Sequence, residues 1–270
     1  MIQKTIGKLL FYYFPTLERQ AGLHHAISTR LGGVSTGSYS SLNLGFHVGD
    51  IHDRVLENHH LISQSLEFDL SSLVSCQQVH DSTIALIDKA YLQASCYLPD
   101  KTIAHTDALI TDMPGVTLMT RHADCVPISF YNSKTCTVAV VHAGWKGTLA
   151  HIGPKTVEVL EREYKCQRKD VQAALGPSIG PCCYHIDNTM AVLASKKIVR
   201  GKAFIKEGSN KSMSFDLWQA NKEQLLTAGI PEDNIYSAEV CTSCRVNHFF
   251  SYRKEKKVTG RFAAFIGLKE

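Results

Sequence analysis

The chain carries two kinds of hydrophobic pattern, and each predicts a different kind of element. Short runs rich in apolar and β-branched residues predict strands, at 23–30, 77–80, 137–141, 171–175, 249–252 and 261–268. Apolar residues three or four apart predict helices at 53–67, with Asp53 as its N-cap, and at 149–164. Two further helices are predicted to begin near Asp187 and at Asp216. The segment 108–131 is predicted to form two strands joined by a Pro-Gly turn.

The order of these elements predicts an α+β fold. Strands and helices follow one another without the strict strand–helix–strand order of a parallel α/β protein, so we expect mixed sheets with helices on their outer faces. Of the 270 residues 44% are apolar and 20% are charged, which suffices for a sizeable core. The length allows one large domain or two small ones, and no linker or repeat divides the chain.

Charge and cysteine content narrow the function further. A net charge of +4 is too small to indicate a nucleic-acid partner, and no apolar run approaches the roughly 20 residues of a membrane helix, so we expect neither. The basic run at 253–257 is predicted to form an exposed turn, with attraction of an anionic substrate as the less favoured interpretation. Nine scattered cysteines, an odd number, predict reduced thiols in a cytoplasmic protein without structural disulfides.

Two histidines and one cysteine are the residues best suited to chemistry. His80, Cys125 and His142 each end a predicted strand or follow it closely, where a side chain is held rigidly beside a cleft. Two imidazoles and one thiolate suit zinc, and three protein ligands leave a fourth position open for catalysis. Their spacing matches no local metal motif, so the residues alone favour ordinary histidines and a buried cysteine. His122 lies three residues before Cys125 and would face the other side of a strand, which excludes it from the site.

Eight segments of the chain, together and in order, are similar to those of a known family. They include His-Ala-Gly-Trp-Lys-Gly and fall at 28–35, 41–45, 78–80, 123–127, 142–147, 176–184, 249–253 and 259–261. On this combination, which spans nearly the whole chain, the sequence closely resembles the bacterial YfiH/YlmD family, also called the laccase-domain or multicopper polyphenol oxidoreductase family. The resemblance implies one domain over residues 1–270, with two mixed β-sheets sandwiched between helical layers as in a bacterial toxin with a Cys–His deamidase site.

The resemblance also implies an activity and a metal. Members of the family are described as purine nucleoside phosphorylases that act on inosine, adenosine and methylthioadenosine, with adenosine deaminase activity in addition. The family positions that match His80, Cys125 and His142 bind zinc, and copper is the less favoured ion. The resemblance therefore implies a small-molecule partner, a purine nucleoside with phosphate, and says nothing of the oligomeric state.

Four positions depart from the family pattern. Asp81 replaces a glycine, Lys146 an arginine, His185 a glutamate and His59 an arginine. Lysine keeps the charge of arginine but loses the two parallel donors that suit phosphate. Since the metal positions are intact, these departures affect the expected substrate preference rather than metal binding.

Phosphorolysis requires residues that hold an anion and residues that contact the sugar and the base. Arg30 and Lys146 are the candidate anion ligands, with a surface ion pair as the alternative for each. Asn43 and Gln78 are candidates for hydrogen bonds to the sugar or the base, with the capping of a loop as the alternative. Arg261 is a weaker substrate-binding candidate.

Asp124 is a candidate catalytic residue beside the three metal ligands. Because it precedes Cys125, it is predicted either to transfer protons and orient a ligand or to be a buried structural acceptor on the other face of the strand. In a deaminase the same metal would activate water for attack on adenine C6. The usual zinc deaminase signature, His-x-Glu with Pro-Cys-x-x-Cys, is absent from the sequence, so deamination would need a different scaffold.

Two other enzymatic functions remain open. A thiol hydrolase, such as an enzyme that edits peptidoglycan precursors, would use Cys125 as its nucleophile and His142 as its base. A polyphenol oxidase, which the family name implies, would need a multicopper site rich in His-x-His pairs, and the 13 histidines form none.

A structural zinc module is the non-enzymatic alternative. Cys241 and Cys244 form a Cys-x-x-Cys pair, and Cys182 and Cys183 are the residues that would complete four ligands. Adjacent cysteines close a tetrahedral site poorly, and a second Cys-x-x-Cys pair is missing from the sequence. We therefore expect these cysteines to pack within loops.

Overall fold

The strands form two large sheets in the computed structural model, which describes residues 1–94, 102–208 and 212–270. The first sheet has the order β1 (Ile2–Ile6), β2 (Leu9–Tyr13), β3 (Leu23–Ser28), β15 (Phe262–Leu268), β7 (Thr117–His122) and β4 (Leu73–Ser75). The second has the order β14 (Ile235–Ser237), β10 (Val171–Leu175), β8 (Val126–Asn132), β9 (Thr137–Ala143), β6 (Ala108–Thr111) and β5 (Ile84–Leu86). A small third sheet has the order β11 (His185–Ile186), β13 (Met213–Phe215) and β12 (Ile205–Glu207). Both large sheets are mixed, because β4 runs parallel to β7 and β10 to β14 among antiparallel neighbours.

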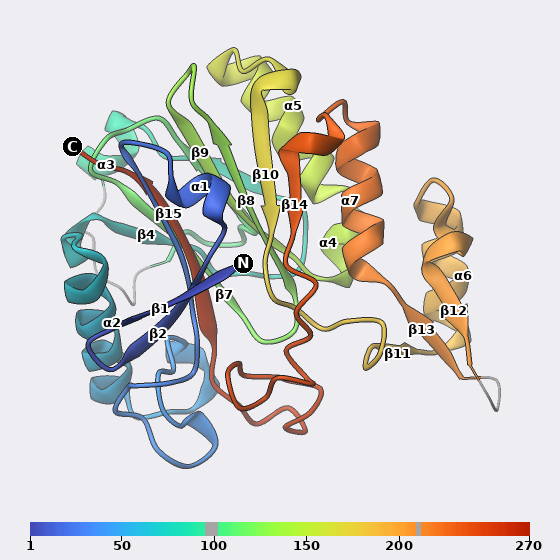
Figure 1. Cartoon of the computed structure of the whole chain (residues 1–270), viewed down its shortest axis with the longest axis horizontal. Coiled ribbons are helices and arrows are strands. Elements are labelled where there is room, and N and C mark those ends of the chain that lie inside the picture. The colour runs from blue at the N-terminus through green and yellow to red at the C-terminus, as the bar shows by residue number, and fades with distance from the viewer. Residues whose placement is uncertain (95–101, 209–211) are drawn as a thin grey trace.

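The two large sheets pack face to face, and helices cover their outer faces (Figure 1). Leu118 and Phe262 of the first sheet share one buried cluster with Val140 and Ala174 of the second. The helices over the second sheet are α4 (Trp145–Leu149), α5 (Ile152–Tyr164) and α7 (Leu217–Thr227), and α2 (His52–Leu66) covers the first. Three further helices are α1 (Pro15–Glu18), α3 (Lys89–Ala94) and α6 (Asn188–Lys197). The layers follow the predicted order of helices, sheet, sheet and helices, which confirms the fold class.

The central strands are mostly apolar because both of their faces are covered. Every residue of β8, β9 and β15 is buried. A strand with one face in water alternates apolar and polar residues, whereas a strand between two layers needs apolar side chains on both sides. The helices predicted to begin near Asp187 and at Asp216 are confirmed as α6 and α7, and both aspartates accept N–H bonds at the first turns. The N-cap predicted at Asp53 is wrong, because α2 begins one residue earlier, at His52 behind Ile51.

Some predicted elements are wrong. The segment 108–131 forms three strands, of which β6 and β8 join the second sheet and β7 joins the first. The helix predicted at 149–164 is present as α5 and ends at the predicted Tyr164, but it begins only at Ile152, because His151 takes a left-handed backbone conformation (φ 59°) between α4 and α5. The segments 77–80 and 249–252 are loops. At 79–81 the backbone N–H groups bind the carboxylate of Asp107 instead of a neighbouring strand.

Two further observations concern the predictions on membrane and disulfides. Among the described residues, none of the helices combines the length and the apolar character that crossing a membrane requires. Eight of the nine cysteines lie in the described part of the chain, and all eight are free thiols. The ninth, Cys96, lies outside the described residues.

Candidate metal centre and adjoining pocket

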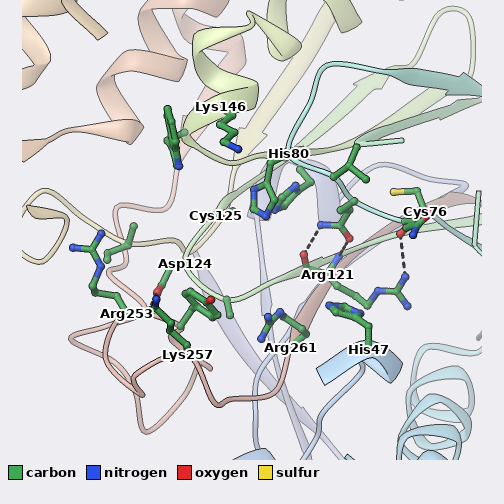
Figure 2. A pocket seen from close by; sticks show the side chains of 18 of the residues that line it. His47, Cys76, His80, Arg121, Asp124, Cys125, Lys146, Arg253, Lys257 and Arg261 are labelled. Carbon is green, nitrogen blue, oxygen red and sulfur yellow. Dashed lines mark hydrogen bonds between the residues drawn. The ribbon is translucent and has the colours of Figure 1, made fainter. Parts of the chain in front are cut away.

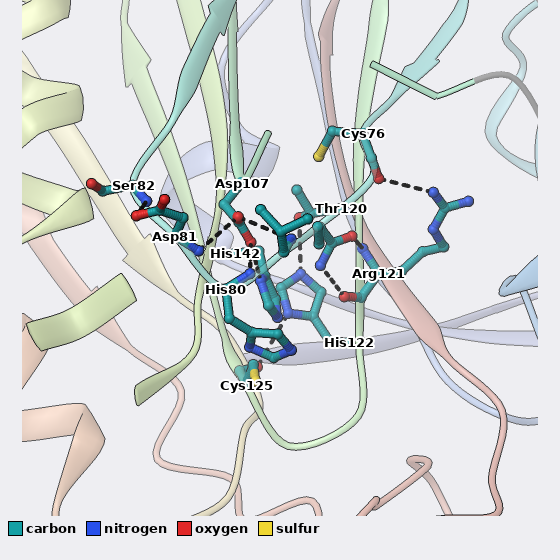
Figure 3. A network of polar contacts seen from close by, with 12 residues as sticks. Cys76, His80, Asp81, Ser82, Asp107, Thr120, Arg121, His122, Cys125 and His142 are labelled. Atoms are coloured by element: carbon teal, nitrogen blue, oxygen red, sulfur yellow. Dashed lines mark hydrogen bonds and ion pairs between the residues drawn. The ribbon is translucent and has the colours of Figure 1, made fainter. Parts of the chain in front are cut away.

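His80, Cys125 and His142 lie together although three separate segments carry them (Figure 3). His80 lies in the loop after β4, Cys125 in the turn between β7 and β8, and His142 in β9. Their ligand atoms all lie within 4.8 Å of one another, and the two imidazole rings have centroids 4.8 Å apart. The structure thus brings together the three side chains that the sequence selects as metal ligands. We call this group the His–Cys–His centre.

Strand pairing and one glycine explain how the three side chains meet. Pro127 of β8 faces His142 of β9, so Cys125, two residues earlier, lies beside the end of β9. Gly144 directly follows the last residue of β9. A Cβ atom at Gly144 would lie 2.7 Å from Nδ1 of His80 and 3.1 Å from Sγ of Cys125. Any larger residue would therefore displace two of the three ligands.

A buried carboxylate, Asp107, positions two members of the centre. Its Oδ1 lies 2.8 Å from Nδ1 of His142. The same carboxylate accepts backbone N–H bonds from Val79 (3.1 Å), His80 (3.1 Å) and Asp81 (2.9 Å). Nε2 of His142 is thereby left for a ligand, as is usual for an imidazole that binds a metal. No local motif links Asp107 to His142, which lies 35 residues away, so sequence reasoning misses it.

The members of the centre change one another's pKa values. Burial alone would raise the pKa of the Cys125 thiol, but His142 and His80 beside it lower that pKa to about 6. Burial would lower the pKa of His142, but Cys125 and Asp107 raise it to about 9. Both shifts favour the charged forms, a thiolate and an imidazolium, and the thiolate is the form of cysteine that binds metals or attacks as a nucleophile.

The centre fits a single metal ion. One sulfur and two nitrogens are donors that zinc accepts, and its bonds of about 2.0–2.3 Å require ligand atoms gathered as closely as these. Three protein ligands are also the number typical of catalytic sites. His122 is not among them, as predicted, because its ring nitrogens contact O of Cys125 (3.1 Å) and Oγ1 of Thr120 (2.8 Å).

The centre forms part of the wall of a pocket of about 880 Å³ (Figure 2). A pocket of several hundred cubic ångströms is of the size that encloses a small-molecule ligand. Five cationic side chains line it: Arg121, Lys146, Arg253, Lys257 and Arg261. Asp124 is the one carboxylate among the described lining residues. This excess of positive charge favours an anionic ligand.

Three of the predicted substrate-binding residues line the pocket. Lys146 is exposed and lies in α4. Gln78 uses its amide to exchange two hydrogen bonds with the backbone of Arg121 (2.7 and 2.8 Å), so its main contact is with β7. Arg261 binds the carbonyls of two preceding residues through Nη1 and lies 5.7 Å from the ring of Tyr252. Lys146 and Arg261 are therefore better placed than Gln78 to contact a ligand.

Arg30 and Asn43 are not among the residues that line the pocket, so their binding of substrate stays a prediction. The guanidinium of Arg30 pairs with Glu255 (2.9 Å) and lies 4.4 Å from the ring centroid of Phe250. Asn43 is fully buried, and its amide binds Asp50 and the backbone of its own loop. The alternatives, an ion pair for Arg30 and a loop cap for Asn43, describe what is observed.

Asp124 has both carboxylate oxygens engaged by protein groups. Oδ1 accepts a hydrogen bond from Oγ1 of Thr242 (2.6 Å), and Oδ2 accepts one from N of Arg253 (2.7 Å). Its backbone is left-handed (φ 88°), and burial raises its pKa in spite of these bonds. This environment favours the structural interpretation over proton transfer.

Several pocket residues are not among the substrate-binding predictions. Arg121 is buried, and its Nη2 binds the carbonyl of Cys76 at 3.0 Å. His47 has its pKa lowered to about 4, first by burial and then by Arg121 and Arg261, so its ring is neutral at neutral pH. Arg253 and Lys257 both belong to the basic run at 253–257, so the interpretation that this run attracts an anion gains support.

The four departures from the family pattern fall in different places. Lys146 lines the pocket, whereas Asp81, His185 and His59 are not among its lining residues. His59 is fully buried and stacks on Phe46, whose ring lies 5.1 Å away and forms part of the wall. A change at position 59 therefore reaches the pocket through Phe46.

Comparison with known proteins adds a family and several relatives. Residues 24–269 match the model of a family described as multi-copper polyphenol oxidoreductase laccase. The chain is 37% identical to purine nucleoside phosphorylase YlmD of Geobacillus stearothermophilus over 251 residues, which cover 93% of this chain and 92% of that protein. It is 32% identical to adenosine deaminase RL5 of an unknown prokaryotic organism over 238 residues, covering 87% and 90%. The crystal structure of YlmD from Geobacillus stearothermophilus has a TM-score of 0.91 to it at 35% identity, covering 99% and 98%.

Proposed function

We propose, from the premise that this chain belongs to the multi-copper polyphenol oxidoreductase laccase family, that it is a zinc-dependent purine nucleoside phosphorylase. Its substrates are inosine, adenosine and methylthioadenosine, each cleaved with inorganic phosphate, and adenosine deamination is a second activity of the same site. The observation that carries the proposal is a metal-binding centre in the wall of a cation-lined pocket. Two relatives named as a purine nucleoside phosphorylase and an adenosine deaminase support a purine nucleoside as substrate.

Phosphate binds among the cationic side chains of the pocket. Arg121 and Arg261 have planar groups whose paired donors match phosphate oxygens, and Lys146 adds a mobile charge. Burial lowers the pKa of both arginines from the ordinary value, yet a guanidinium stays protonated at neutral pH. The pocket therefore compensates the charge of a phosphate dianion.

Phosphorolysis joins a phosphate oxygen to C1′ of the ribose and breaks the bond from C1′ to the base, which leaves with the electron pair. Holding phosphate and nucleoside in one pocket turns this bimolecular step into one between aligned neighbours. The rings of Phe46, Tyr184 and Tyr252 line the same pocket and offer faces on which a purine stacks.

His80, Cys125 and His142 would hold the zinc ion, and Asp107 binds Nδ1 of His142, which leaves Nε2 as the ligand atom. When bound, the ion supplies a Lewis acid that polarises a nitrogen or oxygen of the substrate. The donor set favours zinc, because one thiolate with two imidazoles is a common zinc environment.

Product analysis tests the proposal. Purified protein of known metal content is incubated with inosine or adenosine, with and without phosphate. Hypoxanthine and ribose 1-phosphate are expected from inosine only when phosphate is present. Ammonia released from adenosine without phosphate supports the second activity. If protein that holds its ion turns over neither nucleoside, the proposal is wrong.

A Cys–His thiol hydrolase is the second candidate, and one observation favours it. Cys125, His142 and Asp107 form a series of nucleophile, base and orienting acid, with a thiol pKa lowered to about 6. Iodoacetamide separates the two functions, because a bound ion protects Cys125 whereas a hydrolase thiol reacts at once. Peptidoglycan precursors are the substrates to assay in that case, and phenols with copper-loaded protein test the oxidase that the family description names.

We also propose that the protein acts in the cytoplasm on small molecules. The eight cysteines of the described residues are free thiols, and thiols stay reduced in that compartment.

A further inference from the structure

Two pairs of cysteines meet at the edge of the second sheet. Cys182 and Cys183 follow β10, and Cys241 and Cys244 follow β14. Because β10 and β14 are parallel neighbours, the chain leaves both strands at the same edge. Ser178 forms a parallel bridge with Cys241, which extends the pairing into the two loops. The fold itself therefore brings the two pairs together.

The four sulfur atoms are close enough to share one ion. All four Sγ atoms lie within 4.8 Å of one another, and that of Cys244 lies 3.6 Å from Cys182 and 3.5 Å from Cys183. Zinc–sulfur bonds of about 2.3 Å in a tetrahedron place sulfurs about 3.8 Å apart. The N–H of Gly180 donates to Sγ of Cys241 (3.3 Å), a contact that stabilises a ligating thiolate. Loop packing, the interpretation favoured from sequence, does not explain this gathering.

We propose that Cys182, Cys183, Cys241 and Cys244 form a second metal site, which binds zinc as a tetrathiolate. The turn from Cys241 to Cys244 is closed by an N–H bond from Arg245 to O of Cys241 (2.9 Å), so the Cys-x-x-Cys pair is already folded as a chelate. Four thiolates complete a tetrahedral set, so the ion has a structural role. Cys182 and Cys244 are exposed, which lets the ion enter from solvent.

This four-cysteine site stabilises the segment next to the His–Cys–His centre. Thr242 lies between the two ligands of the Cys-x-x-Cys pair, and its Oγ1 donates to Asp124 (2.6 Å). N of Ile179, just before the other pair, donates to O of Asp124 (2.8 Å). Asp124 precedes Cys125, and Ile179 lines the pocket. An ion that joins the two loops therefore fixes part of the pocket wall.

Metal analysis of the purified, reduced chain tests this proposal. The double variant Cys182→Ser/Cys244→Ser is expected to hold one zinc ion per chain fewer than the wild type, whatever the His–Cys–His centre holds. Cys136→Ser is the matched control, because Cys136 is an exposed free cysteine in the turn between β8 and β9, and it should keep the wild-type content. An unchanged zinc content in the double variant overturns the proposal.

Alkylation of wild-type protein covers the case in which the double variant fails to fold. Iodoacetamide is expected to label Cys136 at once, but Cys182 and Cys244 only after a chelator removes the ion. Cobalt loaded into Cys125→Ser protein should show a thiolate-to-metal charge-transfer band, since the remaining ligands are the four cysteines. Equal labelling of Cys136, Cys182 and Cys244 before and after chelation contradicts the site. A disulfide among the four cysteines in protein kept under reductant contradicts it as well.

Discussion

The two clusters of side chains suited to a metal ion differ in how they are built and in what they adjoin. A loop, a turn and a strand carry the His–Cys–His centre, which has mixed donors and lies in the wall of the pocket. Two loops carry the four-cysteine site, whose ligands are all sulfurs and are absent from the described pocket lining. An incomplete set of ligands suits catalysis and a complete thiolate set suits a structural ion. The fold therefore places the proposed catalytic centre and the proposed structural site only a few residues apart.

The ligands of the two clusters are also held differently. Buried Asp107 orients His142 and anchors the backbone of His80, so the first centre is arranged by the protein itself. The loops of the four-cysteine site are joined by a short parallel bridge and have exposed ligands. Loss of the first ion should therefore affect turnover, and loss of the second should affect stability.

Removal of a ligand from the His–Cys–His centre should have the largest effect on turnover. We expect Cys125→Ala to lower kcat/KM for inosine with phosphate by more than about 100-fold, since even the groups behind a ligand are worth 10–100-fold. The four-cysteine site should keep its ion in this variant. Steady-state kinetics and metal analysis measure both, and near-normal turnover without the first ion would show that the centre is not catalytic.

A change at the buried carboxylate should have the next largest effect. Asp107→Asn keeps the size of the side chain but removes the charge that supports His142, so the affinity of the centre for zinc should fall by about 10–100-fold. Competition with a chromophoric chelator measures it. Asp170→Asn, at a carboxylate that pairs with Lys134, is the control and should bind zinc normally. Equal affinity for zinc in both variants would show that Asp107 does not support zinc binding.

The positive charge of the pocket should affect the KM for phosphate more than the KM for the nucleoside. Lys146→Ala should raise the KM for phosphate by about 10-fold or more, because a hydrogen bond to a charged group is worth about 1.5–3 kcal/mol. Lys146→Arg should restore it, whereas Arg30→Ala should leave it unchanged, since Arg30 lies outside the pocket lining. A raised KM for phosphate in Arg30→Ala alone would reverse our assignment of the anion site.

Loss of the second ion should have the smallest effect on turnover. Wild-type protein in zinc at a thousandfold excess over the dissociation constant gains about 4 kcal/mol from the bound ion, and Cys182→Ser/Cys244→Ser should lose most of that. Chemical unfolding with and without zinc measures it, while kcat should stay near that of the wild type. A fall in kcat as large as that of Cys125→Ala would contradict the distinction between a catalytic and a structural cluster.

Sequence reasoning succeeds where periodicity or a donor set carries the signal. The strand at Val171–Leu175 has the predicted bounds, and α6 and α7 begin where predicted, at Asp187 and Asp216. The ligand trio was selected by donor chemistry and by the family resemblance, and its members meet in the structure.

What the sequence could not predict depends on contacts between distant segments. Asp107 has no local signature, because its partners lie 26 to 35 residues away. The sequence disfavours one site for the four cysteines, because it does not reveal the pairing of β10 and β14 that brings them together. Arg30 lies in a segment that resembles the family, yet its guanidinium forms an ion pair with Glu255, 225 residues later. In each case tertiary contacts decide the role.

A diffraction measurement at the zinc absorption edge, on crystals of zinc-loaded protein, tests the central claim most directly. The account predicts an anomalous peak bonded to His80, to Cys125 and to Nε2 of His142, and a second peak among the four cysteine sulfurs. A zinc-loaded crystal without a peak at the first position, or with an ion there that does not contact Cys125, would contradict it.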